Sequence, residues 1–177
     1  EAVVLVDGDI VNIDVTTELE GWHGDTSRTL FVGTPSAEAV HVVRVAERAL
    51  ALGIAEVRPG APLGSIGRAI EAFARREGCS VVREYGGHGI GRAMHEPLHV
   101  HHHDAGKEGP RMVVGACFTI EPMINLGKPG TRLLADGWTV VTRDRSLSAQ
   151  WEHTILVTEQ GHEVLTLRAE ERQGRTI

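Results

Sequence analysis

Alternating apolar and polar residues near the start of the chain predict a β-hairpin over residues 9–25. From Val11 to Thr16 the apolar side chains occupy every second position, which is the period of a strand with one apolar face. Asp14 lies on the polar face. A turn centred within residues 18–21 places Asp14 almost directly opposite Asp25, with Cβ atoms about 4.5–5.5 Å apart. Two ionised carboxylates at that distance repel each other, so the predicted hairpin needs a shared proton or a cation between them.

Helical periodicity follows the hairpin in two blocks. Thr34 and Pro35 are typical of a helix start, with Thr34 as the N-cap. The apolar stripe of the first helix runs from Val40 to Ile54, and the breaker at residues 59–60 ends it. A second helix is predicted over residues 63–76, with Ile66, Ile70 and Phe73 on its buried face.

Short strands fill most of the remaining chain. They are predicted over residues 80–85, 116–124 and 137–142, and a last hairpin turns at residues 159–161 between arms at 148–158 and 164–166. Residues 94–110 are predicted to form a loop that is rich in histidine. Because strand and helix blocks are segregated, the pattern favours an α+β domain rich in antiparallel strands over a doubly wound sheet.

Length and charge narrow the class of protein. The 177 residues are best interpreted as one domain over 1–177, and the net charge of −6 argues against a nucleic-acid partner. Two cysteines do not make a disulfide framework, and the pattern of neither a signal peptide nor a membrane span is present. We therefore expect a cytoplasmic protein. The first residue, Glu1, lies close to the hairpin, so we expect the domain to be incomplete at its N-terminus.

Three predicted strands each carry a carboxylate flanked by apolar neighbours and by residues two positions away that are mostly polar: Asp14, Glu121 and Glu152. An ionised carboxylate inside a sheet costs several kcal/mol unless it is paired. No lysine or arginine stands at the alternate positions, so a metal ion is the simplest partner. His88 is the natural further ligand, because a histidine between glycines can approach an ion without obstruction and imidazole suits first-row transition metals.

These residues together predict a two-metal hydrolase. Asp14, Asp25, His88, Glu121 and Glu152 supply four negative charges, which balance two divalent ions. Such a pair, about 3.5–4 Å apart, holds and acidifies a water molecule between its ions. Each acid by itself is more commonly an ordinary surface residue, and only their combination favours the metal site.

Other polar features carry less information. Residues 87–91 resemble a phosphate-binding loop but lack its glycine spacing. The run at His99, His101, His102 and His103 is more typical of a solvated loop than of an ion site. His95 is compatible with an acid/base role or with stabilising an oxyanion. The residues around it do not decide between such a role and none. Tryptophans such as Trp138 more often pack in a core or hairpin than line a pocket.

Five motifs in order make the chain resemble the methionine aminopeptidases of type I, the bacterial form. They are DGDIVNIDV with GWHGDTSRT, then YGGHGIG with AMHEP, FTIEPMI, DGWTV, and SLSAQWEHTILVT. The resemblance implies a pita-bread fold, an α+β architecture whose curved, antiparallel-rich sheet carries helices outside. It also implies removal of the initiator methionine when the second residue is small.

The resemblance assigns roles to individual residues. It implies a dinuclear site with Asp25 and Glu152 as bridging ligands, Glu121 in proton transfer, and His95 at the substrate carbonyl. Two substrate-binding positions follow, Trp138 and Met94, although the family usually has an aromatic residue where Met94 stands. The metal ions could be Mn, Fe(II), Co or Zn, and the partner is a peptide or nascent-chain N-terminus. Contact with the ribosome is left open, and neither nucleic acid nor membrane is implied.

Two alternatives remain at the level of sequence. Proline-specific aminopeptidases and prolidases use the same five ligands on the same fold, but GWHGDTSRT and GGHGIGRAMHEP favour the methionine enzyme. A non-catalytic binding module of this fold is the alternative from a different class. Such modules usually lose their ligands, whereas all five are present in this chain.

Overall fold

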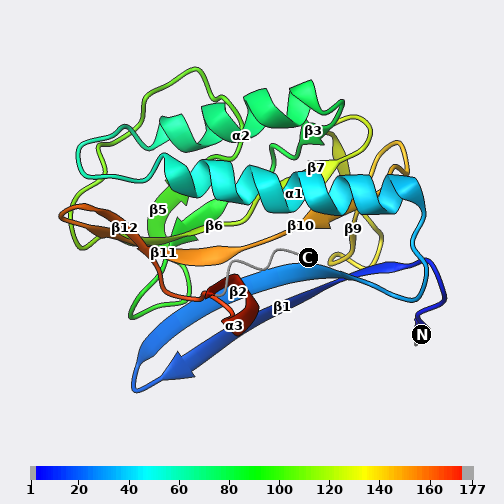
Figure 1. The fold of residues 1–177 in the computed structure, drawn as a ribbon, viewed down its shortest axis with the longest axis horizontal. Helices are drawn as coiled ribbons and strands as arrows, with labels where there is room; N and C mark the ends of the chain where they lie inside the picture. The colour runs from blue at the N-terminus through cyan, green and yellow to red at the C-terminus, as the bar shows by residue number, and fades with distance from the viewer. Residues whose placement is uncertain (1–2, 173–177) are drawn as a thin grey trace.

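The structure of the chain, a computed structural model, describes residues 3–172. Two long helices, α1 (Ala37–Ala55) and α2 (Gly64–Arg76), lie side by side over a set of antiparallel strands (Figure 1). The remaining elements, in chain order, are β1 (Ile10–Leu19), β2 (Trp22–Phe31), β3 (Ser80–Val81), β4 (Gly87–Gly89), β5 (Glu96–Val100), β6 (Cys117–Ile120), β7 (Met123–Asn125), β8 (Thr131–Leu133), β9 (Val140–Thr142), β10 (Ser148–Gln150), β11 (His153–Thr158), β12 (Gly161–Val164) and α3 (Ala169–Arg172). The predicted α+β class is confirmed.

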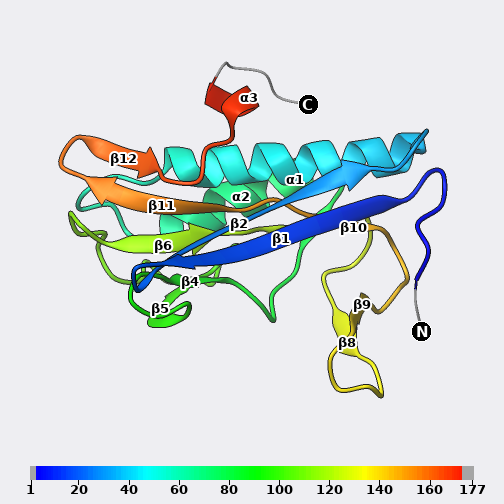
Figure 2. The ribbon, with the colours of Figure 1, turned by 90° about the horizontal axis from the view of Figure 1, so that it is seen from below.

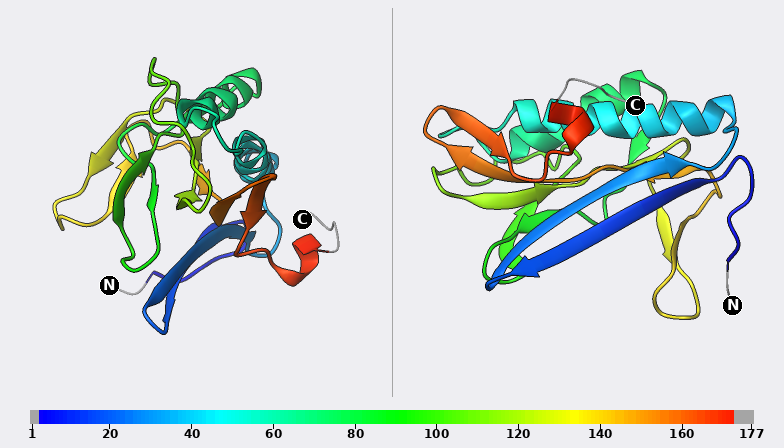
Figure 3. Two further views of the ribbon diagram at one scale, coloured as in Figure 1. Left: turned by 90° about the vertical axis from the view of Figure 1, so that its left-hand side faces the viewer. Right: turned by 60° about the horizontal axis from the view of Figure 1, so that its bottom comes forward.

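The strands form one larger sheet and several smaller ones. The order in the five-stranded sheet is β12-β11-β6-β4-β5, and a three-stranded sheet has the order β10-β7-β3. The β1–β2 hairpin crosses the side of the strands that faces away from α1 and α2 (Figure 3). The β8–β9 hairpin projects from the body of the molecule (Figure 2). All registered strand pairs are antiparallel, as the sequence pattern predicted.

The apolar stripes of the helices form the core as predicted. On α1, Ala46 and Leu50 are buried, and on α2, Ile66 and Ile70 are completely buried. Each such isoleucine contributes about 1.5–3 kcal/mol relative to an exposed position. The two helices approach closely at Gly53, where a Cβ atom would lie 2.8 Å from Ile70 Cδ1. This core supports the strands that carry the polar residues of interest.

Helix α1 begins later than the sequence predicted. Its N-cap is Ser36, whose hydroxyl accepts a hydrogen bond from the Ala39 N–H at 3.1 Å. Thr34 instead donates its backbone N–H to the Asp7 carboxylate at 2.8 Å. Thr34 therefore belongs to the turn that leaves β2, and the prediction that it caps the helix is wrong.

The hairpin over residues 9–25 is confirmed, but its predicted register is wrong. Asp25 pairs with Thr16, and Asp14 pairs with Ser27, so the two aspartates are diagonal rather than directly opposed. The turn consists of Glu20 and Gly21, both with positive φ, at 53° and 79°. This is the geometry of a two-residue turn that matches the twist of a hairpin. It places the turn one residue later than the centre that we assumed.

Several predicted strands are shorter or divided. Of the strand predicted over residues 80–85, only the first two residues form a strand, β3. The strand predicted over 116–124 is split into β6 and β7 by Glu121 and Pro122, since proline has no N–H for a strand ladder. The hairpin arm predicted over 148–158 is likewise split, at residues 151–152, so Glu121 and Glu152 stand at breaks between strands rather than in their centres. Strands β4 and β8 were not predicted, and β5 lies within the predicted loop over 94–110. The returning arm of the last hairpin, β12, covers residues 161–164 rather than 164–166.

One face of β1 is exposed in the described part of the chain. Ile13 and Val15, on the apolar side of the hairpin, are 50% and 47% exposed. Among the described helices, none combines the length and the apolar character that a membrane crossing requires.

Candidate metal centre

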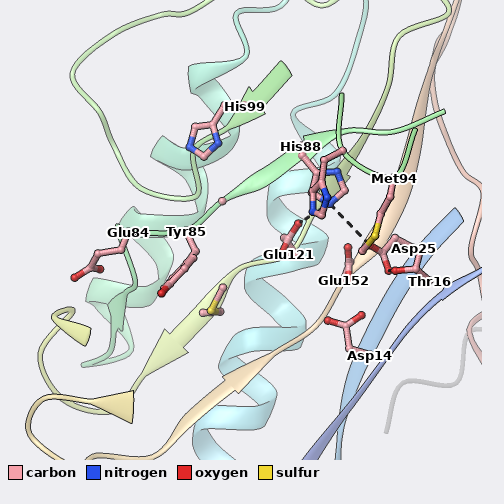
Figure 4. A pocket seen from close by; sticks show the side chains of 13 residues that line it. Asp14, Thr16, Asp25, Glu84, Tyr85, His88, Met94, His99, Glu121 and Glu152 are labelled. Atoms are coloured by element: carbon pink, nitrogen blue, oxygen red, sulfur yellow. Dashed lines mark hydrogen bonds and ion pairs between the residues drawn. The ribbon is translucent and has the colours of Figure 1, made fainter. Parts of the chain in front are cut away.

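One cavity of about 590 Å³ brings together most of the residues that the sequence singled out. All five predicted metal ligands line it, and so do Met94 and His95 (Figure 4). The ligands come from the β1–β2 hairpin, from β4, and from the two breaks between strands. Trp138 does not line this cavity.

Asp25 is held in place at its side chain and on both sides of its backbone. It is 4% exposed, and its Oδ1 atom accepts a hydrogen bond from the Thr16 hydroxyl at 2.8 Å. Its N–H donates to Thr154 Oγ1 at 3.0 Å, and the Thr154 hydroxyl donates to the Asp25 carbonyl at 2.8 Å. Because Thr154 lies in β11, these bonds fix β2 against the five-stranded sheet at the position of the carboxylate.

Glu152 is fixed next to Asp25 by the same contact between segments. Its N–H donates to the Ser27 carbonyl at 3.0 Å, and the Thr26 hydroxyl donates to the Glu152 carbonyl at 2.9 Å. Glu152 is 1% exposed. The chain thus buries two carboxylates side by side, which is stable only if something compensates their repulsion.

His88 presents one free nitrogen atom to these acids. Its Nδ1 atom lies 3.0 Å from the Gly89 carbonyl oxygen, and because a carbonyl only accepts, Nδ1 carries the proton. Nε2 is therefore the ring nitrogen that faces the acids, and it lies 3.8 Å from Asp25 Oδ2 and 3.7 Å from Glu121 Oε1. A hydrogen bond of this kind fixes the tautomer of most metal-binding histidines.

Glycine allows β4 to approach its neighbour. A Cβ atom at Gly87 would lie 2.2 Å from the Thr119 carbonyl oxygen. Asp25, His88 and Glu152 each offer an atom within 4.8 Å of the others, which is the spacing of ligands around a metal ion.

Glu121 is oriented by three hydrogen bonds. The Thr119 hydroxyl donates to Oε1 at 2.7 Å, and the Gln150 amide donates to Oε2 at 3.3 Å. The Glu121 N–H donates to His102 Nε2 at 3.1 Å. His102 is 1% exposed, so the prediction that the whole histidine run is a solvated loop is wrong for this residue.

Burial and mutual repulsion raise the pKa of three of these carboxyls in the absence of a cation. Burial, and then the neighbouring carboxylates Glu121, Asp25 and Asp14, raise the pKa of Glu152 to about 10. Burial and the repulsion of Asp25 and Asp14 raise the pKa of Glu121 to about 7, although the Thr119 hydrogen bond opposes the rise. Burial and Asp25 also raise the pKa of Asp14. Divalent cations would reverse these shifts, and a donor set of carboxylate oxygens with one imidazole fits first-row divalent metals.

Arg168 supports the centre from outside, and nothing in the sequence pattern pointed to it. Its guanidinium donates to the Ser27 carbonyl at 2.7 Å and to the Thr26 hydroxyl at 2.9 Å. These are the residues that hold the backbone of Glu152, and the Arg168 charge partly offsets the raised pKa of that carboxyl.

His95 lies at the cavity beside a proposed ligand. The ring centroids of His95 and His88 are 4.2 Å apart. The turn before His95 is tied to the hairpin by Arg92, which donates to the Glu20 carbonyl at 3.2 Å and stacks over Trp22 with 3.8 Å to the ring centroid. The turn before His95 is thus fixed to the hairpin, and the His95 ring, which is exposed, lies beside the His88 ring.

Trp138 stands apart from the site. It lies between β8 and β9 in the projecting hairpin and is 86% exposed. Its backbone N–H donates to the Asp136 carboxylate at 3.0 Å, which orders the turn. The substrate-binding role that the resemblance implies for Trp138 stays a prediction.

The supporting residues were visible in the sequence only as a pattern. Polar side chains stand two positions from the acids, and the structure gives four of them hydrogen-bonding roles in the centre. These four are Thr16, Thr119, Gln150 and Thr154. His102 carried a misleading signal, because its neighbours in the histidine run are polar.

The chain is similar to known proteins in both sequence and fold. The family model described as metallopeptidase family M24 matches residues 1–159. A curated relative, methionine aminopeptidase B of Synechocystis, is 53% identical over 164 residues, covering 93% of this chain and 60% of the relative. The crystal structure of methionine aminopeptidase from Rickettsia prowazekii superposes with a TM-score of 0.90 at 51% identity, covering 92% of this chain and 66% of that chain.

More distant structures share the architecture alone. The prolidase from Pyrococcus horikoshii superposes with a TM-score of 0.70 at 24% identity. The pita-bread fold implied by the sequence motifs is confirmed by these neighbours. The chain spans about 60–65% of the length of the curated relatives it matches. The family model matches most of the residues of this chain. The chain therefore belongs to metallopeptidase family M24.

Proposed function

We propose that this chain carries the catalytic site of a methionine aminopeptidase, which hydrolyses the bond after an N-terminal methionine when the second residue is small. One observation carries the proposal: five potential ligands converge on a single cavity with no lysine or arginine among its lining residues. The similarity to proteins named methionine aminopeptidase supports this reaction over others of the family.

Two divalent ions are proposed to bind at this cavity. Asp14, Asp25, His88, Glu121 and Glu152 would hold them, with Asp25 and Glu152 shared between the ions. The ions could be Mn, Fe(II), Co or Zn, since each accepts oxygen ligands together with one imidazole. When bound, such ions supply an acidified water and polarise a carbonyl group.

Glu121 is suited to move a proton during the reaction. Its carboxylate lines the cavity beside the other proposed ligands, and a carboxylate within reach of the attacking water can act as a general base. The hydrogen bonds from Thr119 and Gln150 fix its oxygens toward the cavity. Its proposed part is to take a proton from the attacking water and pass it to the leaving amine.

His95 is suited to hold the substrate carbonyl. It lies next to His88 at the cavity but is not hydrogen-bonded to the carboxylates in the described residues. An imidazole N–H at this position can donate to the oxygen that gains charge as the carbonyl is attacked. One such donor contributes about 10²–10³-fold to the rate in other hydrolases.

An apolar recess beside the main cavity suits the methionine side chain. It has a volume of about 260 Å³ and shares Tyr85 and Met123 with the main cavity. Val82 and Val140 contribute further apolar surface. Met94, which lines the main cavity and is 39% exposed, and Trp138 are proposed to contact substrate as well.

A peptide panel with added Mn²⁺ or Co²⁺ tests the proposal. We expect cleavage of Met-Ala-Xaa peptides and little cleavage when the second residue is bulky. Cleavage of Xaa-Pro peptides but not of Met-Ala would instead indicate a proline-specific enzyme. Metal binding without turnover of either class would indicate a binding module, and both results would contradict the proposed function.

A further inference from the structure

Three histidines outside the carboxylate centre form a row of imidazole rings that meet edge to face. They stand at alternate positions, and the ring centroids are 4.4 Å apart for His99 and His101 and 5.2 Å apart for His101 and His103. All three line a separate cavity of about 150 Å³ beside the start of α2. His101 is the central ring, because it contacts both of the others.

The backbone under this row is clamped against α2. A Cβ atom at Gly67 would lie 2.3 Å from the His103 carbonyl oxygen, and one at Gly64 would lie 2.3 Å from the Lys107 carbonyl oxygen. The Asp104 N–H also donates to the Glu71 carboxylate at 2.9 Å. The three imidazoles therefore project from an ordered segment, and the entropy cost of bringing them to a common ligand is reduced.

The rings are available as ligands. His103 Nδ1 is shielded from solvent and has no hydrogen-bond partner among the described residues. Burial, together with the charges of neighbouring groups, lowers the pKa of His101 and of His103, which favours the neutral imidazole. Metals bind neutral imidazole, so at neutral pH little proton release is needed.

We propose that His99, His101 and His103 form a second metal site, for a first-row transition ion that prefers imidazole, such as Ni²⁺, Cu²⁺ or Zn²⁺. Two rings two residues apart on one side of an extended segment can chelate one ion, and the third can complete the set. Among the described residues, only Asp25, His88 and Glu152 already bring three ligand atoms within 4.8 Å of one another. Binding at the histidines therefore requires rotation of at least one exposed ring.

The site differs from the carboxylate centre in the ions it selects. Its donors are nitrogen atoms, whereas four of the five ligands at the centre are carboxylates, so Mn²⁺ favours the centre and Ni²⁺ favours the histidines. His99 lines both cavities, which places the second site directly beside the first. Lys107 lines the histidine cavity too, and its charge is expected to keep the affinity moderate.

An anion is a poorer occupant of this cavity, although it lies at a helix start. The first amides of α2 are already engaged: the Gly64 N–H donates to the Glu108 carbonyl at 2.8 Å, and the Ser65 N–H donates to the Pro62 carbonyl at 3.0 Å. The amides that would bind a phosphate are thus occupied, while the imidazole nitrogens are not.

Nickel titration of variants tests the second site independently of any peptidase activity. The background is Asp25→Asn, which weakens the carboxylate centre, and the probe is Ni²⁺ alone, followed by calorimetry. His101→Gln removes the central ring, and His41→Gln is the control, because His41 is exposed on α1 and lines neither cavity.

We expect the control to bind one equivalent of Ni²⁺. His101→Gln should bind it at least about tenfold more weakly, because losing even a residue that only supports a ligand lowers metal affinity by about tenfold. Equal affinity in the two variants would overturn the proposal. A second readout is the broadening of histidine proton resonances by substoichiometric Ni²⁺. Broadening of His101 and His103 is expected, and broadening confined to His88 and His95 would contradict it. His103→Gln repeats the test if His101→Gln folds poorly.

Discussion

Glu71 and Glu152 are both buried carboxylates, with 5% and 1% of their surface exposed, but their surroundings differ in charge. Glu71 accepts hydrogen bonds from Arg83 at 2.9 Å and from Arg75 at 3.0 Å. Burial alone would raise its pKa, but the Asp104 amide and the two guanidinium groups outweigh burial and lower it. Glu152 has other carboxylates as its nearest charged neighbours, and its pKa rises to about 10.

This difference separates a structural acid from a functional one. The chain neutralises Glu71 with its own cations, so that carboxylate holds the histidine segment and α2 together. The chain leaves Glu152 and Glu121 largely without such partners, and the cost is several kcal/mol unless a cation is supplied from outside. Burial of an acidic side chain alone therefore does not indicate a metal site. Burial of an acidic side chain that has no lysine or arginine partner does indicate one.

The largest expected effect comes from Asp25→Asn. The amide keeps the size of the side chain but removes one charge from the cluster, so we expect weak metal binding and a nearly complete loss of turnover, because turnover depends on the bound ions. Calorimetry and the peptide assay measure the two effects. Glu71→Gln is the matched control and should retain both metal affinity and turnover. Turnover of Asp25→Asn like that of the unmodified chain would show that Asp25 is not a bridging ligand.

His95→Ala sharpens the comparison by separating groups that hold a cation from groups that hold substrate. We expect turnover to fall about 10²-fold, in line with the loss of one oxyanion donor. Metal affinity should change little, because His95 is not bonded to the carboxylates in the described residues. Equal losses of affinity and turnover would make His95 a ligand or the support of one.

Glu152→Gln and Glu71→Gln should change the stability of the metal-free protein in opposite directions. At pH 8 we expect Glu152→Gln to stabilise it, on the order of 2–4 kcal/mol, because the penalty for a carboxyl with a raised pKa disappears. Glu71→Gln should destabilise it by about 1–3 kcal/mol through the loss of charge-assisted hydrogen bonds. Denaturant unfolding in the presence of a chelator measures both. Shifts of the same sign would break the distinction between the two acids.

The pH dependence of metal-free stability follows from the raised pKa values. Between pH 4.5 and about 7 the folded protein keeps a proton on Glu121 that the unfolded chain has lost, and Glu152 extends this window to about pH 10. The folded state binds more protons, so the free energy of unfolding falls as pH rises, by up to about 1.4 kcal/mol per pH unit for each group. Below about pH 6.5 the buried His102, whose pKa is lowered from 6.5 to about 3, gives the opposite slope, so thermal unfolding from pH 7 to 9 tests this trend. Saturating metal should flatten it, and a rise in metal-free stability over this range would contradict it.

Arg168→Gln has the smallest expected effect. It removes the bonds to the Thr26 hydroxyl and the Ser27 carbonyl but no potential ligand, so metal affinity should fall by about tenfold at most. Arg172→Gln, an exposed change at the end of helix α3, which begins just after Arg168, is the control and should leave affinity unaltered. Identical affinities for the two variants would show that Arg168 does not position the centre.

The sequence was sufficient for the hairpin, the core stripes and the convergence of the acids. Period-two alternation locates β1, and the absence of nearby lysine or arginine marks Asp14, Glu121 and Glu152 as acids in need of a partner. These signals come from residues close together in the sequence, so they do not depend on contacts between distant segments. The register failed because it depends on which two residues of the turn take positive φ, here Glu20 and Gly21.

What the sequence could not supply depends on contacts between distant segments. Arg168 reaches Thr26 and Ser27 across more than 140 residues, and no pattern near Arg168 indicates this. His102 is buried because the Glu121 amide needs an acceptor there, although its neighbours in the run are polar. The interruption at residues 151–152 likewise involves a distant contact, the bond from the Glu152 N–H to the Ser27 carbonyl. Pro122, in contrast, is a strand breaker that the sequence itself shows.

Calorimetric titration of the metal-free chain with Mn²⁺ or Co²⁺ at pH 7, in two buffers of different ionisation enthalpy, tests the central claim most directly. The account predicts divalent-ion binding with release of about one proton or more, since Glu152 is protonated without metal and must ionise to act as a ligand. Failure to bind a divalent ion, or binding that releases no proton, would contradict the view that these buried acids, which largely lack lysine and arginine partners, form a metal site.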